Sequence, residues 1–250
     1  MKLISLNAWG CRVEEPLLEY IQEQSKTVDV FCFQEILKGG VGKTHRDEVR
    51  SGFEDISKIL SDYTGYFSEY GEGGYYNESS DSLNFKYGVA CFVRTSLKQS
   101  FVGGITLYDL ERKWSDYSGK FAAGASMAVK VEDYVIENVH GMWQESIKTD
   151  TEAKIEQSKK ILELANKADG KKVICGDFNM LPDTKSIQML ADEYVDLIKE
   201  YKIENTRSSL YPKELRHSDY AFADKSITVN SFLVPDLDIS DHLPLLLDFN

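Results

Sequence analysis

The sequence predicts an α/β (α+β) protein built from two similar units that pack face to face. Strand-like and helix-like segments alternate along all 250 residues, without an obvious linker, repeat array or low-complexity tail. A strand–helix–strand series in the first half is echoed in the second half, and each series ends in an apolar strand followed by a carboxylate, Glu35 or Asp177. We therefore expect residues 1–250 to form a single domain in which the strand ends of both units converge on one cleft.

The first unit is predicted to alternate strands with helices. Residues 2–9 give a strand. Residues 14–26 have the apolar spacing of an amphipathic helix, with Pro16 and two glutamates at the start, where the helix dipole favours them. Residues 28–36 are a continuous apolar run, which is typical of a strand buried on both faces. Residues 46–62 predict a second amphipathic helix.

The segment 64–87 is predicted to be a long loop because it is rich in Gly, Tyr, Ser and Asn. Its length is typical of a functional loop or lid. Its tyrosines could stack on bases or line an apolar pocket, but we favour a simple anchoring role for most of them. These tyrosines are Tyr66, Tyr70, Tyr75, Tyr76 and Tyr87.

The second unit contains further strands and two helices. A tight turn at Glu132 and Asp133 predicts a hairpin. Residues 150–168 form the longest predicted helix, and residues 183–194 form another, for which Asp183 is a good N-cap. The strands are expected at 88–96, 121–131, 133–141, 171–179, 227–234 and 243–249.

The composition is that of a globular protein, with 42% hydrophobic and 28% charged residues. No secretion signal is apparent and no apolar run approaches the ~18 residues of a membrane span. We therefore expect a cytoplasmic monomer with no stable membrane association. The four cysteines lack CxxC spacing, which argues against a zinc site or a redox pair. The formal net charge of −12 argues against a protein that grips long duplex nucleic acid, although it permits a local basic groove.

Polar and ionisable side chains stand at the ends of the predicted strands: most follow a strand, whereas Asp241 and His242 precede the last strand and Asp219 precedes a short apolar run. A carboxylate directly after a buried strand is costly unless it is paired or binds a cation. Taken singly, each has an ordinary structural explanation, such as a turn or a hydrogen-bonded histidine. Their order along the chain and their common position at strand ends indicate a shared site. They are Asn7, Glu35, His140, Asp177, Asn179, Asp219, Asp241 and His242.

The chemistry of these side chains suits a metal and a phosphoryl group. Asn7, Glu35 and Asp241 offer the hard oxygen ligands that Mg²⁺ or Mn²⁺ prefers over Zn²⁺. His140 and His242 could donate protons or stabilise charge on a phosphoryl group.

Five ordered motifs resemble those of the endonuclease/exonuclease/phosphatase superfamily, which has the deoxyribonuclease-I-like fold. The motifs are LNAWG, FQE, NVHG, GDFN and SDHLPL, and they extend from Asn7 to His242. The resemblance implies a four-layered α/β sandwich, in which two packed mixed β-sheets are flanked by helices. It also implies a divalent-metal-dependent phosphoesterase.

The resemblance assigns roles on the metal side of the site. Glu35 would bind the catalytic divalent ion, Mg²⁺ or Mn²⁺, with Asn7 beside it. Asp241 would lie near this metal or near a second metal position. Asp177 would orient or deprotonate the attacking water.

The same resemblance assigns roles on the phosphate side. His140 would hydrogen-bond a non-bridging phosphate oxygen, and Asn179 would contact the phosphate. His242 would stabilise the pentacovalent phosphorane, while Asp219 of the DY motif would hold its imidazole.

The sequence also departs from the family pattern. Some DNA-repair relatives have an Asp where this chain has Trp9, and LNAWG is instead similar to the start of neutral sphingomyelinases and tyrosyl-DNA phosphodiesterases. Many relatives have an Arg two residues before the DY Asp, but here His217 takes that position and Arg216 precedes it. We therefore assign no phosphate-binding arginine. Residues Arg112, Lys113 and Trp114 could form a cation–aromatic cluster or a solvated hairpin, and Trp143 could line the cleft or simply pack.

These observations predict hydrolysis of a phosphodiester by in-line attack of an activated water, with a phosphate ester such as a nucleic acid or nucleotide as substrate. The alternative is a phosphomonoesterase or a phospholipid hydrolase, of sphingomyelinase or inositol-phosphate type. A catalytically inactive module that binds a phosphorylated ligand is a third hypothesis. The presence of Glu35, Asp177 and His242 argues against it.

Overall fold

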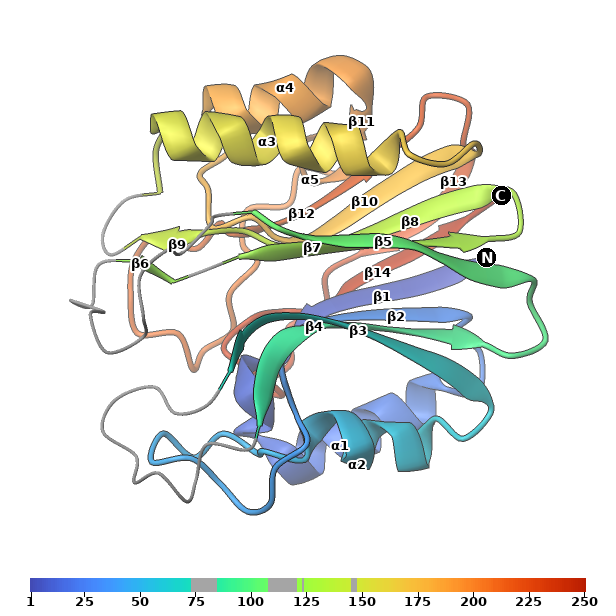
Figure 1. Cartoon of the computed structure of the whole chain (residues 1–250). Helices are drawn as coiled ribbons and strands as arrows, with labels where there is room; N and C mark the ends of the chain where they lie inside the picture. The colour runs from blue at the N-terminus through green and yellow to red at the C-terminus, as the bar shows by residue number, and fades with distance from the viewer. Residues whose placement is uncertain (73–84, 108–120, 123, 145–147) are drawn as a thin grey trace.

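Two six-stranded mixed β-sheets pack face to face in the computed structural model, and helices cover both outer faces (Figure 1). This confirms the four-layered α/β sandwich. The structure describes residues 1–72, 85–107, 121–122, 124–144 and 148–250. Within these residues, no helix combines the length and the apolar character needed to cross a membrane.

The first sheet has the strand order β13-β14-β1-β2-β4-β3, with β1 and β2 parallel and the other pairs antiparallel. Helices α1 (Glu14–Gln24) and α2 (Gly52–Ile59) cover its outer face (Figure 1). The last strand pairs with the first, so the two chain termini lie side by side. The strands are β1 (Lys2–Asn7), β2 (Val30–Lys38), β3 (Tyr63–Glu72), β4 (Lys86–Arg94), β13 (Val229–Leu233) and β14 (Leu245–Phe249).

The second sheet has the order β11-β12-β10-β8-β7-β5, and its outer face is covered by α3 (Glu152–Ala165), α4 (Lys185–Glu193) and α5 (Leu197–Glu200) (Figure 1). A two-stranded ribbon, β6 (Phe121–Ala122) with β9 (Trp143–Gln144), lies beside it. The strands are β5 (Gln99–Thr106), β7 (Ala125–Val131), β8 (Tyr134–His140), β10 (Lys171–Asp177), β11 (Val195–Asp196) and β12 (Asp219–Ala223).

The two sheets repeat one arrangement, as the sequence predicted. In each, a parallel strand pair is joined by a helix that crosses the outer face: β1–α1–β2 in the first sheet and β8–α3–β10 in the second. The carboxyl ends of these four strands lie at the same end of the sandwich, on the left in Figure 1. This end is where the candidate site forms.

Several predicted elements differ from the observed ones. The predicted loop 64–87 is wrong over most of its described part, because residues up to Glu72 form β3, which pairs along β4. Pairing with a neighbouring strand satisfies the backbone of a segment whose composition favours a loop. Tyr66 and Tyr70 lie in β3 and Tyr87 in β4. Tyr75 and Tyr76 are outside the described residues, as are Arg112, Lys113 and Trp114.

Two helix starts also need correction. The predicted helix 46–62 is helical only from Gly52 to Ile59, because residues before it form a turn closed by the Lys43–Val49 bridge. The N-cap of α4 is Thr184 rather than Asp183: the Thr184 hydroxyl accepts a hydrogen bond from the Ile187 amide. The hairpin at Glu132 and Asp133 is confirmed.

The described core contains all four cysteines as free, buried thiols, which agrees with their apolar sequence surroundings. Burial, followed by the charges of Glu14 and Asp55, raises the pKa of Cys11 to about 12, so this thiol is protonated at neutral pH.

Candidate active site

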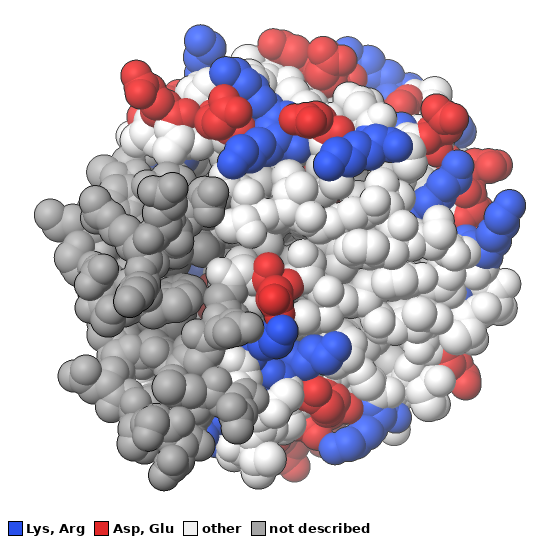
Figure 2. Space-filling view, in the orientation of Figure 1, with Lys and Arg blue, Asp and Glu red and all other residues white. Residues whose placement is uncertain are grey.

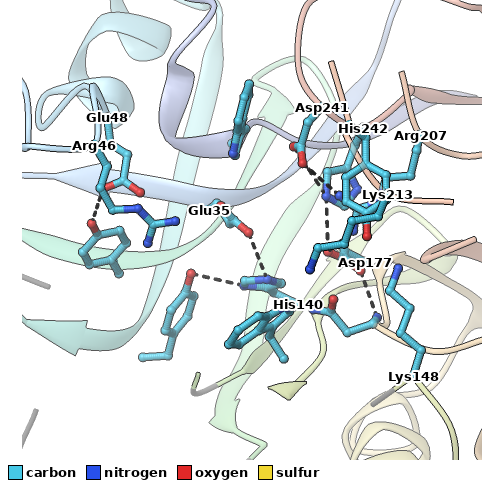
Figure 3. Close-up of a pocket in the computed structure, with 16 residues that line it drawn as sticks. Glu35, Arg46, Glu48, His140, Lys148, Asp177, Arg207, Lys213, Asp241 and His242 are labelled. Carbon is cyan, nitrogen blue, oxygen red and sulfur yellow. Dashed lines mark hydrogen bonds and ion pairs between the residues drawn. The ribbon is translucent and has the colours of Figure 1, made fainter. Parts of the chain in front are cut away.

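A cavity of about 300 Å³ opens between the strand ends of the two sheets (Figure 3). The structure brings all eight predicted side chains together there. Asn7 and Asp219 lie behind the cavity and are hydrogen-bonded to the side chains that line it. The six predicted residues that line it are Glu35, His140, Asp177, Asn179, Asp241 and His242.

Glu35 reaches the cavity because strand β2 is irregular at that point. The register between β2 and β4 shifts between Phe33 and Ile36, and Glu35 has a positive φ of 54°. The second sheet fixes this irregularity: Asn138 of β8 donates to the backbone oxygens of Phe33 at 2.9 Å and Ala90 at 3.0 Å. A buried polar link between the sheets therefore sets the direction of Glu35.

Glu35 lies within a small hydrogen-bonded group. The amide nitrogen of Asn7 donates to Glu35 Oε1 at 3.1 Å and to Asp177 Oδ2 at 3.1 Å, while the Asn7 amide oxygen accepts from the Trp9 amide at 2.9 Å. His140 Nε2 lies 3.5 Å from Glu35 Oε1. Burial opposes ionisation of Glu35, but His140, His242 and Asn7 outweigh it and hold the pKa of this carboxyl below its usual value.

Asp177 is the centre of the site. It accepts hydrogen bonds from the Ser218 hydroxyl, from the backbone N–H of Asn179 at 2.9 Å and from the side-chain amide of Asn7. His242 Nε2 lies 3.5 Å from Asp177 Oδ2. Burial would raise the pKa of Asp177, but His242, Arg207 and His140 hold it well below the ordinary range, so the carboxylate is ionised.

The glycines of the GDFN and NVHG motifs permit the close approach of these strand ends. Gly176 has a φ of 137°, and a Cβ there would lie 1.9 Å from the Val139 carbonyl oxygen. A Cβ on Gly141 would lie 2.3 Å from the Phe178 carbonyl oxygen. Larger residues would push apart the strand ends that bear His140 and Asp177.

His242 is held between carboxylates. Its Nδ1 lies 2.8 Å from Asp219 Oδ1 and 3.0 Å from Asp219 Oδ2, and its Nε2 lies 3.7 Å from Asp241 Oδ1. Burial and Arg207 lower the pKa of His242, but Asp219, Asp241 and Asp177 together raise it above the usual value. Burial raises the pKa of Asp241, against the opposing effects of His242 and Arg207.

Arg207 is a buried cation of the site that the sequence did not indicate. Its guanidinium donates to Asp241 Oδ2 at 3.1 Å and to the Ser218 hydroxyl at 3.0 Å, and lies 3.9 Å from Asp177. An isolated antiparallel β-bridge pairs the backbone of Arg207 with that of His242 and so places Arg207 at the site. No motif marks it, since it stands in a polar, irregular segment.

Arg216 and His217 occupy the positions where many relatives carry an arginine before the DY Asp, but neither lines the cavity. Arg216 donates to the backbone oxygens of Arg207 and Ser208, and His217 Nε2 lies 3.1 Å from the Ile203 oxygen. They support the segment that carries Arg207.

The cavity has two chemically different sides (Figure 3). On one side Tyr70 hydrogen-bonds His140 Nδ1 at 3.1 Å. Trp143, in β9, also lines the cavity. Figure 3 places Arg46 and Glu48 on this first side, where Tyr87 hydrogen-bonds Glu48; Trp9 also lines the cavity. The second, which we call the basic side, is formed by Lys148, Arg207, Tyr211 and Lys213.

The donor set fits a hard divalent cation. Ligand atoms of Glu35, His140 and Asp177 lie within 4.8 Å of one another, and so do those of Asp177, Asp219 and His242. Asp241 Oδ1 is buried and has no hydrogen-bond partner among the described residues. A carboxylate oxygen left in this way beside other carboxylates matches the ligand needs of Mg²⁺ or Mn²⁺.

Comparison with known proteins gives one family. The sequence model of the Endonuclease/Exonuclease/phosphatase family matches residues 4–242. A sequence search of curated proteins finds no match.

Solved structures with the same fold come from bacteria and from human. An endonuclease/exonuclease/phosphatase family protein from Bacteroides thetaiotaomicron is 18% identical, with a TM-score of 0.68 over 100% of this chain and 94% of that chain. A mannosyl-6-phosphatase from the same organism is 17% identical, with a TM-score of 0.66 over 100% and 99%. The catalytic domain of human Nocturnin, with a bound sulfate anion, is 18% identical, with a TM-score of 0.63 over 100% and 93%.

Proposed function

The chain belongs to the endonuclease/exonuclease/phosphatase family, whose members are phosphoester hydrolases, and we propose that it hydrolyses a phosphodiester with a divalent cation. The observation that carries this proposal is the convergence of Glu35 with His140, and of Asp177 with the His242–Asp219 pair, on one cavity. A nucleotide or a nucleic acid end is the substrate type we favour.

Glu35 and Asp241 would hold Mg²⁺ or Mn²⁺, with Asn7 beside them. The bound cation would supply positive charge next to a phosphoryl oxygen. Asn7 already donates to both Glu35 and Asp177, so it would keep these two carboxylates at a fixed separation.

Asp177 would align the attacking water. Because its pKa is held well below the ordinary range, it is ionised at neutral pH and can accept a hydrogen bond from water. The same low pKa makes it a weak base, so orientation is the role that its surroundings favour.

His242 and His140 would stabilise the charge that grows on the phosphoryl oxygens. Asp219 accepts from His242 Nδ1 and leaves Nε2 toward the cavity. His140 presents Nε2 beside Glu35, while Tyr70 holds its other ring nitrogen. Asn179 is fixed by donation to the Gly141 oxygen at 3.0 Å, close to where the phosphate would lie.

The test is turnover of bis(p-nitrophenyl) phosphate by purified protein. We expect hydrolysis with Mg²⁺ or Mn²⁺, none with EDTA, and a fall of about 10³-fold in His242→Ala. His217→Ala is the matched control because His217 lies outside the cavity. Absence of metal-dependent turnover in the wild-type protein would contradict the proposal.

A phosphomonoester or phospholipid substrate is the second candidate. The similarity in fold to a mannosyl-6-phosphatase favours a monoester. Faster metal-dependent release of p-nitrophenolate from p-nitrophenyl phosphate than from the diester would favour the monoesterase, and turnover of sphingomyelin vesicles would favour the lipid hydrolase.

A further inference from the structure

Two lysines on the basic side have no carboxylate partner. In the described part of the chain, neither Lys148 nor Lys213 forms an ion pair within 4.0 Å. Elsewhere in the described chain some lysines pair with carboxylates, as Lys43 does with Glu14 and Lys159 with Glu156. Figure 2 shows the same mixing of acidic and basic side chains on the visible face. In a protein of net charge −12, these two lysines therefore bring unpaired positive charge to the cavity.

Lys148 is held in place beside another cation. Its Nζ donates to the His217 backbone oxygen at 3.0 Å and lies 5.5 Å from the centre of the Tyr211 ring. The guanidinium carbon of Arg207 lies 4.3 Å from the same ring centre. A single buried aromatic ring thus orients two positive charges on one side of the cavity.

The positive charges on the basic side repel one another. Burial, and then the charge of Arg207, lowers the pKa of Lys148 to about 8; Asp177 and Asp219 oppose this effect, and Lys213 adds to it. Arg207 is already paired with Asp241, whereas Lys148 and Lys213 are not paired among the residues described. Figure 3 shows both lysines extending toward the cavity from the side of Asp177, opposite Arg46 and Glu48. An anionic group bound between them would offset the repulsion.

We propose that Lys148, Lys213 and the Tyr211 ring form a second anion subsite, and that the substrate carries an additional phosphate group beside the one that reacts. Two ammonium groups suit a phosphate dianion, which offers several acceptor oxygens to point charges. This inference rests on the proposed phosphoesterase function. The additional phosphate could belong to a nucleotide or to a sugar.

Binding of matched ligands tests the subsite without turnover. Calorimetry with Ca²⁺ in place of Mg²⁺ would compare thymidine 3′,5′-bisphosphate with thymidine 5′-phosphate, and mannose 1,6-bisphosphate with mannose 6-phosphate. We expect the bisphosphate to bind at least about tenfold tighter in one pair, which would identify the scaffold. In the double variant Lys148→Gln/Lys213→Gln this ratio should fall to about one.

Lys159→Gln is the control, since this exposed lysine of α3 lies outside the cavity and should leave the ratio unchanged. The single variants Lys148→Gln and Lys213→Gln should each lower the ratio of bisphosphate to monophosphate affinity in part. They therefore test the subsite even if the double variant folds poorly. Ratios near one in both wild-type pairs, or a ratio that survives in the double variant, would overturn the subsite.

Kinetics separates the two proposals. The p-nitrophenyl ester of thymidine 5′-phosphate would be compared with the same ester bearing a 3′-phosphate. Metal-dependent hydrolysis of both with equal kcat/KM, together with equal binding, would reject the subsite and retain the phosphoesterase. Hydrolysis of neither would count against the phosphoesterase, and the binding ratios would still decide the subsite.

Discussion

His242 and Asp219 form a buried pair in which both carboxylate oxygens of Asp219 lie within 3.0 Å of His242 Nδ1. The carboxylate accepts from Nδ1, so Nε2 is the nitrogen directed to Asp177 and the cavity. Asp219 also opposes the effect of burial and Arg207 on the pKa of His242, which is raised as a result. The pair therefore fixes both the orientation and the charge of the imidazole.

Asp219→Asn should lower activity on the diester by about a hundredfold or more, because the neutral amide supports a charged imidazole poorly. It should also shift the alkaline loss of activity to lower pH, since a protonated His242 is lost as pH rises through its pKa and Asp219 keeps that pKa high. The measurement is kcat/KM against pH. Asp236→Asn, at an exposed position, is the control. An unshifted alkaline limb would count against this role.

Glu35 and Asp177 could be predicted from sequence because each follows a continuous apolar run. The strand of Glu35, β2, runs parallel to β1, and the strand of Asp177, β10, runs parallel to β8 in the other sheet. Both parallel pairs direct their carboxyl ends to the same end of the sandwich. The hydrophobic pattern of the sequence and the geometry of the sheets therefore both place Glu35 and Asp177 at the site.

The rest of the site could not be predicted in the same way. Arg207 and Lys213 come from an irregular polar segment, which is held against the site by long-range contacts such as the backbone bridge between Arg207 and His242. Tyr70 lies in a strand whose composition favours a loop, and its pairing with β4 overrides that preference. Long-range contacts of this kind leave no periodicity in the sequence.

Removal of the Glu35 charge should weaken divalent metal binding. We expect Glu35→Gln to raise the Kd for Mn²⁺ by at least about tenfold, since even the partners of metal ligands affect affinity by this amount. Mn²⁺ should also raise the Tm of the wild-type protein more than that of the variant. Electron paramagnetic resonance of free Mn²⁺ measures the Kd, and Glu19→Gln on the exposed face of α1 is the control. Equal Kd values would remove Glu35 from the metal site.

Asn138 should be important for both stability and the position of Glu35. Its side chain is buried between the sheets, donates to Phe33 and Ala90, and accepts from Gln34 at 2.6 Å. Asn138→Ala leaves two buried carbonyl oxygens without this donor and should lower the free energy of unfolding by about 2–4 kcal/mol.

Urea denaturation measures this loss, and Asn230→Ala is the matched control because Asn230 hydrogen-bonds Asp248 at an exposed position. We also expect kcat on the diester to fall in folded Asn138→Ala, since the β2 irregularity that presents Glu35 loses its tie to β8. A loss of stability below about 1 kcal/mol would show that water or neighbouring groups replace the amide.

Glu137 should make the protein less stable as pH rises. This carboxyl is fully buried in β8; one oxygen accepts from the Ser126 hydroxyl, and the other has no hydrogen-bond partner among the described residues. Burial raises the pKa of Glu137 well above its usual value, despite the opposing effect of Ser126. The folded protein therefore binds a proton that the unfolded chain releases at neutral pH.

The sign of the pH dependence follows from the raised pKa. The stability contribution of protonated Glu137 is fully present below the unfolded pKa of about 4.3 and is lost as pH rises toward the folded pKa, by about 1.4 kcal/mol per pH unit. Glu137→Gln cannot ionise, so its free energy of unfolding relative to the wild-type protein should increase between pH 5 and pH 7, by about 1–3 kcal/mol in total. Urea denaturation at each pH measures the difference. Glu132→Gln, on the exposed β7–β8 turn, should show no such trend. A constant difference between Glu137→Gln and wild type across this range would mean that Glu137 is ionised in the folded protein.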